Sequence, residues 1–259
     1  MKKKTLAVLV GVLGVLCVVC GALLLWGGRS TPKTQDMGAG ASVEETPRPT
    51  STPTAAPTAE TAPYESPIDF DALQAQNPDI YAWLTVPNTD IDYPLVQRAG
   101  DDDFYLTHDS DGNENATGAI FTESAYNGTS MDDPVTVAYG HQMHTGAMFG
   151  NLQALYSGPD SLTDYGEIVV YLPEKELHYA VFAAVPYDNR HILYNFDFTS
   201  ARRYNAFLNS IYDVRAIGAQ FSETVVPSTD DKLLILSTCL QGNSQKRYLV
   251  LAKCVTEID

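Results

Sequence analysis

The chain has 259 residues and a formal net charge of −16, with 32 acidic and 16 basic side chains. This acidic excess argues against nucleic-acid binding, which requires a basic surface facing the phosphates. A hydrophobic content of 44% is sufficient for one folded domain with a sizeable core.

The start of the chain predicts a membrane anchor. Lysines occupy positions 2–4, and residues 5–28 form an apolar run long enough to cross about 30 Å of hydrocarbon as a helix. The positive-inside tendency places residues 1–4 in the cytoplasm and the rest of a single-pass protein outside the cell. A cleaved signal peptide is the alternative, although its apolar core would be shorter. A lipoprotein modified at Cys20 is disfavoured by the bulky valines before it.

Two regions follow this run. Residues 29–67 are rich in Thr, Pro and Ala and contain little that could be buried, so they are expected to form an extracellular stalk. Residues 68–259 have the length and patterning of one folded domain.

Within that domain, short strands separated by turns predict a mainly β barrel or sandwich. Residues 68–84 suggest one or two short helices, with Asp69 as an N-cap and Pro78 opening a second turn. A further helix is expected within residues 196–216, because apolar residues recur there at helical spacing. The expected strands are residues 82–86, 91–97, 118–123, 134–140, 167–173, 177–187, 232–239 and 247–255.

The last two strands carry a cysteine and an arginine that a hairpin would place together. If residues 240–246 close an antiparallel hairpin, Cys239 and Arg247 face each other with Cβ atoms about 5 Å apart. A permanent cation there would favour a thiolate and could hold a developing oxyanion. The alternative is a structural cysteine beside a solvated arginine.

Cys254 is the second cysteine beyond the apolar run, so a disulfide with Cys239 must be considered. In the same hairpin, Cys254 lies near Lys232, about 23 Å along the strand from Cys239. A disulfide requires Cα atoms within about 7 Å. Cys239 is therefore expected to be a free thiol, and Cys254 a packing residue.

A nucleophilic thiol requires a base, and His141 is the best candidate because it follows a predicted strand, as Cys239 ends one. His144 is the alternative base. The two histidines could also begin a metal site, but no partner cluster with ligand spacing accompanies them. Ser237 is a weaker nucleophile candidate, since no G-x-S-x-G elbow surrounds it.

Four motifs, YGHQM, GAMFGNL, LSTC and RYLVLAK, together resemble those of the sortases, specifically class B. The resemblance extends over the chain from about residue 68. It implies an eight-stranded sortase-type β-barrel with short N-terminal helices and one helix before the penultimate strand. It also implies that His141, Cys239 and Arg247 are the catalytic residues.

The family resemblance implies a membrane-anchored cysteine transpeptidase of Gram-positive cell surfaces, a thiol-dependent hydrolase or acyltransferase. Such an enzyme cleaves a C-terminal sorting signal through a cysteine thioester. It transfers the product to an amine of a peptidoglycan cross-bridge or a pilin lysine. We expect Ser237, Thr238, Leu106 and Thr107 to contribute to substrate binding, and no cofactor is indicated.

Two other functions remain open from the residues alone. A cysteine peptidase or amidase would use the same groups but transfer the acyl group to water. A wall-binding surface protein would have an inert cysteine. An acceptor-dependent product distinguishes the transpeptidase from both.

Overall fold

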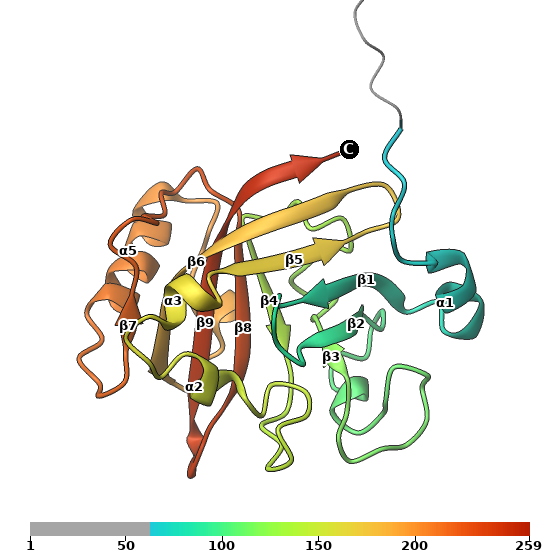
Figure 1. Cartoon of the computed structure of the whole chain (residues 1–259), viewed down its shortest axis with the longest axis horizontal. Helices are drawn as coiled ribbons and strands as arrows, with labels where there is room; N and C mark the ends of the chain where they lie inside the picture. Colours follow the sequence, from blue (N-terminus) through green and yellow to red (C-terminus); the bar gives the residue numbers. More distant parts are fainter. Residues whose placement is uncertain (1–62) are drawn as a thin grey trace, which may run out of the picture. The chain divides into compact units, whose positions relative to one another are not determined.

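The computed structural model describes residues 63–259, which belong to one compact unit (Figure 1). The predicted cytoplasmic segment 1–4, anchor 5–28 and most of the predicted stalk 29–67 lie outside the described residues. Among residues 63–259, no helix is both long and apolar enough to cross a membrane.

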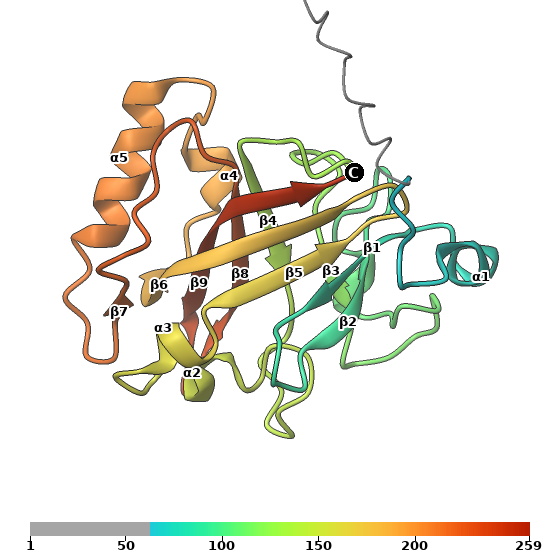
Figure 2. The same cartoon turned by 45° about the horizontal axis from the view of Figure 1, so that its top comes forward.

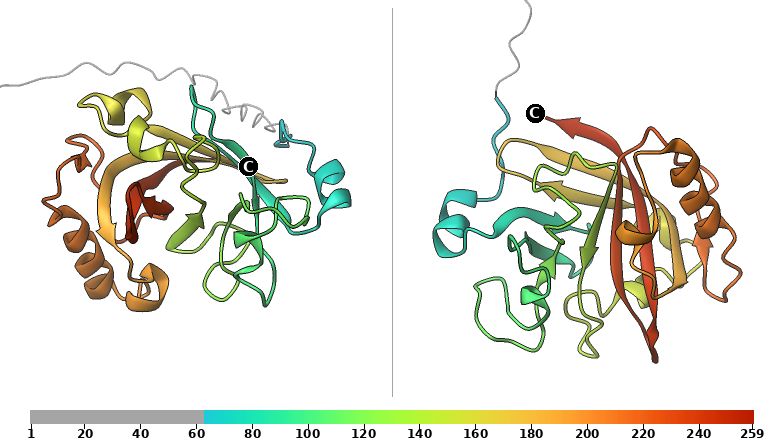
Figure 3. Two further views of the ribbon diagram at one scale, coloured as in Figure 1. Left: turned by 90° about the horizontal axis from the view of Figure 1, so that it is seen from below. Right: turned by 180° about the vertical axis from the view of Figure 1, so that it is seen from behind.

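Within residues 63–259, nine strands form a single sheet that closes on itself. Their order is β5-β1-β2-β3-β4-β8-β9-β6-β7, and β5 also pairs with β6. The pairing of β5 with β6 closes eight strands into a barrel and leaves the two-residue β7 outside the ring, as the view from below illustrates (Figure 3). The strands are β1 Ile80–Thr85, β2 Asp92–Val96, β3 Ile120–Phe121, β4 Val135–Tyr139, β5 Glu167–Tyr171, β6 Glu176–Asp188, β7 Gln220–Phe221, β8 Leu233–Leu240 and β9 Asn243–Ile258.

The prediction of a mainly β, eight-stranded barrel is therefore confirmed. Each of the eight expected strands overlaps an observed one, whereas β7 was not expected. A strand of two residues is too short for alternation to reveal it.

The helices are short, apart from one. They are α1 Phe70–Gln76, the 3-10 turn η1 Phe104–Leu106, α2 Leu152–Leu155, α3 Ser161–Asp164, α4 Ile192–Asn195 and α5 Ala201–Tyr212. Asp69 caps α1 as predicted, accepting a hydrogen bond of 3.0 Å from the backbone N–H of Ala72. A turn begins at Pro78 as predicted, closed by a hydrogen bond of 3.1 Å from the Ile80 N–H to the Asn77 carbonyl, but it leads into β1 and forms no second helix.

The longest helix, α5, precedes β8 as predicted and lies outside the barrel (Figure 2). Its side chains Tyr204, Phe207, Leu208 and Ile211 are buried. They pack in one apolar cluster with outward-facing residues of β4, β6, β8 and β9. A second cluster fills the interior of the barrel. Residues 233–238 of β8 and 248–252 of β9 are thus buried between these two clusters.

Candidate active site

Cys239 and Arg247 are directly opposed across the β8–β9 hairpin, as the sequence predicted. The Arg247 Nη1 atom lies 3.8 Å from the Cys239 sulfur. The same nitrogen donates to the backbone carbonyls of Ser244, at 3.0 Å, and Lys246, at 3.3 Å. These contacts hold the guanidinium against the thiol, where a permanent positive charge stabilises negative charge on sulfur or on a nearby oxygen.

The turn of this hairpin is tighter than expected. We predicted a loop over residues 240–246, but β8 continues to Leu240 and β9 begins at Asn243. Gly242 adopts a φ of 77°, a conformation that glycine tolerates best, and the register shifts between Cys239 and Leu240. The Gln241 N–H donates to the Gln153 side chain in α2 at 3.1 Å, which anchors the tip of the hairpin.

Cys254 does not form a disulfide with Cys239, and both thiols are free. The Cys254 N–H donates to the Lys232 carbonyl at 2.9 Å, at the opposite end of the hairpin from Cys239. Burial raises the pKa of the Cys254 thiol. The predicted free thiol at position 239 and the packing role of Cys254 are both confirmed.

His141 follows β4, and its ring is held by the loop that contains Leu106. Its Nε2 atom lies 2.8 Å from the Leu106 carbonyl oxygen. A carbonyl can only accept, so Nε2 carries the proton, and Nδ1 remains available as a base in the neutral ring. Gly118 packs against the ring, since a Cβ atom there would lie 3.1 Å from His141 Cδ2. Within residues 63–259, no hydrogen bond joins this imidazole to Cys239.

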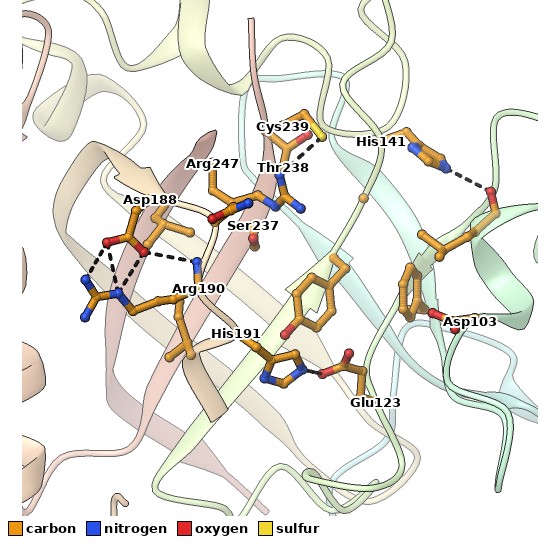
Figure 4. Close-up of a pocket in the computed structure, with 17 residues that line it drawn as sticks. Asp103, Glu123, His141, Asp188, Arg190, His191, Ser237, Thr238, Cys239 and Arg247 are labelled. Carbon is orange, nitrogen blue, oxygen red and sulfur yellow. Dashed lines mark hydrogen bonds and ion pairs between the residues drawn. The ribbon is translucent and has the colours of Figure 1, made fainter. Parts of the chain in front are cut away.

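These residues line one cleft with a volume of about 250 Å³ (Figure 4). Cys239 and His141 occupy the same end of it, with Arg247 beside the cysteine. Of the predicted substrate-binding residues, Ser237, Thr238 and Leu106 line the cleft. The fourth, Thr107, does not line the cleft, and its hydroxyl lies 3.2 Å from His108 Nδ1. His144, the alternative base, is exposed and also lies outside the cleft lining.

The Thr238 hydroxyl is buried without a hydrogen-bond partner among the described residues. A buried hydroxyl left unpaired costs free energy that a bound ligand can recover. Thr238 adjoins Cys239 in β8, and successive strand residues point to opposite faces of the sheet, so its hydroxyl lies on the face opposite Cys239.

A second polar group lies farther along the cleft. Glu123 accepts a hydrogen bond of 2.8 Å from His191 Nε2, and Tyr139 lines the same cleft. Burial raises the pKa of Glu123, and the adjacent His191 opposes that shift. On the neighbouring wall, the Arg190 guanidinium donates three hydrogen bonds of 2.6 to 2.9 Å to the Asp188 carboxylate.

The sequence model of the sortase domain matches residues 84–255, which include the cysteine, the arginine and the histidine. The chain belongs to the sortase family. It is therefore a sortase-family cysteine transpeptidase, and its similar proteins are class B sortases.

Two curated relatives are named sortase B. The protein from Listeria monocytogenes is 27% identical over 71% of this chain and 73% of its own length. The Staphylococcus aureus protein is 26% identical over 72% of this chain and 74% of its own length.

Solved structures agree with this assignment. Sortase B from Bacillus anthracis, in complex with AAEK2, superposes with a TM-score of 0.63 at 28% identity, over 75% of this chain and 89% of that one. A Streptococcus pyogenes class B sortase involved in pilus biogenesis superposes with a TM-score of 0.62 at 28% identity. The match covers 73% of this chain and 98% of that one. A Staphylococcus aureus sortase B–substrate complex superposes with a TM-score of 0.63 at 25% identity. The match covers 74% of this chain and 87% of that one.

Sequence reasoning missed several residues that line the cleft of this sortase, notably Glu123, Tyr139, Asp188, Arg190 and His191. Tyr139 and Asp188 each end a strand, and Glu123 comes two residues after one. Polar residues at strand ends are common in binding sites, so this position was a usable signal. Within residues 63–259, no cluster of three or more His, Cys, Asp or Glu side chains could hold a metal ion.

Proposed function

We propose that this protein cleaves a C-terminal sorting signal through a thioester on Cys239 and transfers the product to an amine. The observation that carries the proposal is the contact of Arg247 with Cys239 in a cleft that His141 also lines. The proposal includes the N-terminal anchor, residues 5–28, and a catalytic domain, residues 68–259, held outside the membrane by the segment 29–67.

In the acylation step, the Cys239 thiol passes its proton to Nδ1 of His141, and the sulfur attacks the carbonyl carbon of the scissile peptide bond. Arg247 donates to the carbonyl oxygen as that oxygen becomes negative, because its guanidinium cannot lose its charge. The C–N bond then breaks, and His141 gives its proton to the departing amine. The products are a thioester on Cys239 and the released C-terminal peptide.

In the transfer step, an amine attacks the thioester carbon and loses a proton to His141, which restores the free thiolate. The contact with the Leu106 carbonyl persists through both steps, since Nε2 carries a proton in the neutral and in the protonated imidazole and a carbonyl accepts from either. Nδ1 is then the atom that exchanges protons. Catalytic hydrogen bonds are often long or absent before substrate binds, so the separation of His141 from Cys239 is compatible with this role.

The test uses the full-length protein in detergent with a library of fluorogenic sorting-signal peptides, with and without a primary amine such as a lysine derivative. A transpeptidase yields a peptide–amine conjugate whose formation depends on amine concentration. Cleavage at an unchanged rate without conjugate would show a hydrolytic peptidase instead. No cleavage of any peptide would contradict the proposal and favour a surface-binding protein.

A further inference from the structure

The ring of His141 is held by the carbonyl of Leu106, and one peptide plane sets the direction of that carbonyl (Figure 4). Within residues 63–259, no group other than His141 donates to the Leu106 oxygen. The Thr107 N–H belongs to the same planar peptide unit and points in the opposite direction. It donates to the Phe104 carbonyl at 3.2 Å. Whatever fixes the Phe104 carbonyl therefore also directs the Leu106 oxygen toward His141.

The neighbouring carbonyls are occupied by other partners. The Tyr105 carbonyl accepts from the Ala119 N–H at 3.0 Å, and the Thr107 carbonyl accepts from the Asn115 N–H at 2.8 Å. These two bonds hold the chain on either side of Leu106. The Leu106 carbonyl is thus left available for a side chain of the active site.

His108 is the side chain that fixes the Phe104 carbonyl. Its Nδ1 atom lies 2.9 Å from the Phe104 oxygen, and because a carbonyl can only accept, Nδ1 carries the proton. The competing bond from the Thr107 N–H is 3.2 Å long and closes the single 3-10 turn η1, a kind of turn whose hydrogen-bond geometry is poor. The imidazole therefore supplies the shorter of the two bonds that hold this end of the turn.

The His108 ring is itself held by stacking. It lies nearly parallel to the Phe104 ring, with the ring centres 3.8 Å apart and an angle of 12° between the planes. The Arg98 guanidinium carbon lies 3.9 Å from the centre of the same Phe104 ring. Two groups at that distance cannot share one face, so Phe104 is enclosed between them. Arg98 in turn lies 3.5 Å from Asp79, which accepts a hydrogen bond of 2.8 Å from the buried Tyr105 hydroxyl.

We infer that His108 is a positioning residue of the active site, which directs the Leu106 carbonyl toward Nε2 of His141. With the proton held on Nε2, the neutral base presents Nδ1 as the atom that exchanges protons. His108 lies outside the cleft lining, so it acts through His141 and not on the substrate. The inference rests on the proposed function for the role of His141, but the state of the His141 ring can be measured without a peptide.

The test uses a matched pair of variants of the full-length protein in detergent, His108→Asn and His108→Leu. The two new side chains have nearly the same shape and both lose the stacked ring, but only asparagine can place a donor where Nδ1 lies. In His108→Leu, kcat/KM for peptide cleavage should fall about tenfold, because a small displacement of a catalytic group has such a cost. His108→Asn should recover most of that loss.

The tautomer of His141 gives a readout that a purely structural role would not change. The ¹⁵N chemical shifts of its two ring nitrogens, measured with ¹⁵N-labelled histidine at a pH where the ring is neutral, report which nitrogen carries the proton. The signals of His141 are identified by their loss in His141→Ala. In His108→Leu, the ratio of the Nε2–H to the Nδ1–H form should fall about tenfold, as expected for the loss of one hydrogen bond. In His108→Asn the ratio should stay near its original value.

Two further variants complete the comparison. His108→Phe keeps an aromatic ring but lacks the donor, so it should behave as His108→Leu does, and it provides the same test if the leucine variant does not fold. His144→Leu is the matched control, because this exposed histidine lies three residues from His141 and outside the cleft lining. It should change neither kcat/KM nor the tautomer ratio of His141.

Full activity or an unchanged tautomer ratio in the two variants that lack a donor would overturn the inference. Equal losses in His108→Asn and His108→Leu would also overturn it, since the hydrogen bond would then not matter. If the unmodified protein cleaved no peptide, the proposed function would be contradicted, and the tautomer ratio would still show whether His108 orients the His141 ring.

Discussion

The two sides of the candidate active site are held by different kinds of structure. Cys239 and Arg247 lie in adjacent strands that pair along β8 from Leu233 to Cys239, and the residues that precede Cys239 and follow Arg247 are buried. His141 lies just beyond a strand, and its ring is fixed by one hydrogen bond to Leu106 and by packing against Gly118. Many backbone hydrogen bonds between paired strands resist the displacement of a residue within them. A side chain on a loop is held by only a few contacts.

This difference separates the two chemical roles. Oxyanion stabilisation requires a positive charge in a fixed position, and the pairing of β8 with β9 provides that position for Arg247. Proton transfer occurs twice in the proposed cycle, and each transfer requires His141 within hydrogen-bond reach of the reacting group, so catalysis depends on the few contacts that position its ring. The strand side is therefore expected to be sensitive to side-chain chemistry, and the loop side to small changes in position.

The largest effects are expected on the strand side. Cys239→Ala removes the nucleophile and should leave no detectable turnover in the peptide assay. Arg247→Lys keeps a positive charge but loses the planar fork, and we expect kcat/KM to fall by about 10²-fold or more. The far-ultraviolet circular dichroism spectrum of each variant should match that of the unmodified protein. Normal turnover in Cys239→Ala would refute the assigned nucleophile.

The next largest effect tests the base. His141→Ala should lower kcat/KM by about 10²- to 10⁴-fold, because the leaving amine then lacks a proton donor. His144→Ala is the matched control, since this exposed histidine lies three residues away and outside the cleft lining. Its kcat/KM should stay within about twofold of that of the unmodified protein, as expected for a surface substitution. Loss of activity in His144→Ala alone would show that the base is misassigned.

The same difference explains how much the sequence could predict. The opposition of Cys239 and Arg247 followed from two apolar strands and a connecting loop, since strand periodicity fixes which residues face each other. The helix α5 followed from its apolar spacing in the same way. These features depend on residues close together in the chain.

The contact between Glu123 and His191 could not be predicted in this way. It joins two segments that are 68 residues apart and lie outside regular strands. The choice of Leu106 as the partner of His141 depends on the path of the segment between β2 and β3, which has no periodicity. Placing such contacts requires the closed barrel, because the strands on either side bring the loops together.

A smaller effect would show how strictly the loop side must be positioned. Gly118→Ala should lower kcat/KM by about 10-fold or more, because a displacement of about 1 Å in a catalytic group can cost that much. The added Cβ would lie 2.5 Å from the Tyr105 carbonyl oxygen and 3.1 Å from His141 Cδ2, so the loop or the ring must move. This change leaves the β8–β9 pairing that holds Cys239 opposite Arg247 intact.

Gly112→Ala is the control for this substitution. Gly112 also has a positive φ, 81° against 61° at Gly118, but a Cβ atom there meets no atom within 4 Å. Both variants carry the strain of alanine in that backbone conformation, so the difference between them isolates the clash near His141. Equal activities in the two variants would show that the position of His141 tolerates this movement.

The smallest expected effect tests whether surface ion pairs contribute to the rigidity of the strand side. His178 in β6 contacts Glu167 through Nδ1 at 2.8 Å and Glu176 through Nε2 at 2.7 Å. The hydrogen bond to Glu167 and then that to Glu176 raise the pKa of His178 above 6.5, against the opposing effect of burial. The stabilisation is therefore fully present below pH 6.5 and is lost as the pH rises through the raised pKa.

His178→Gln should accordingly lower the free energy of unfolding more at pH 5.5 than at pH 8.5. Because Glu167 is largely exposed, we expect a difference below about 1 kcal/mol, measured by urea unfolding at both pH values. A larger loss at pH 8.5 would contradict the direction of the pKa shift. Tyr187 of β6 pairs with Arg247 of β9. Unchanged peptide cleavage by this variant would therefore show that strand pairing positions the arginine without these ion pairs.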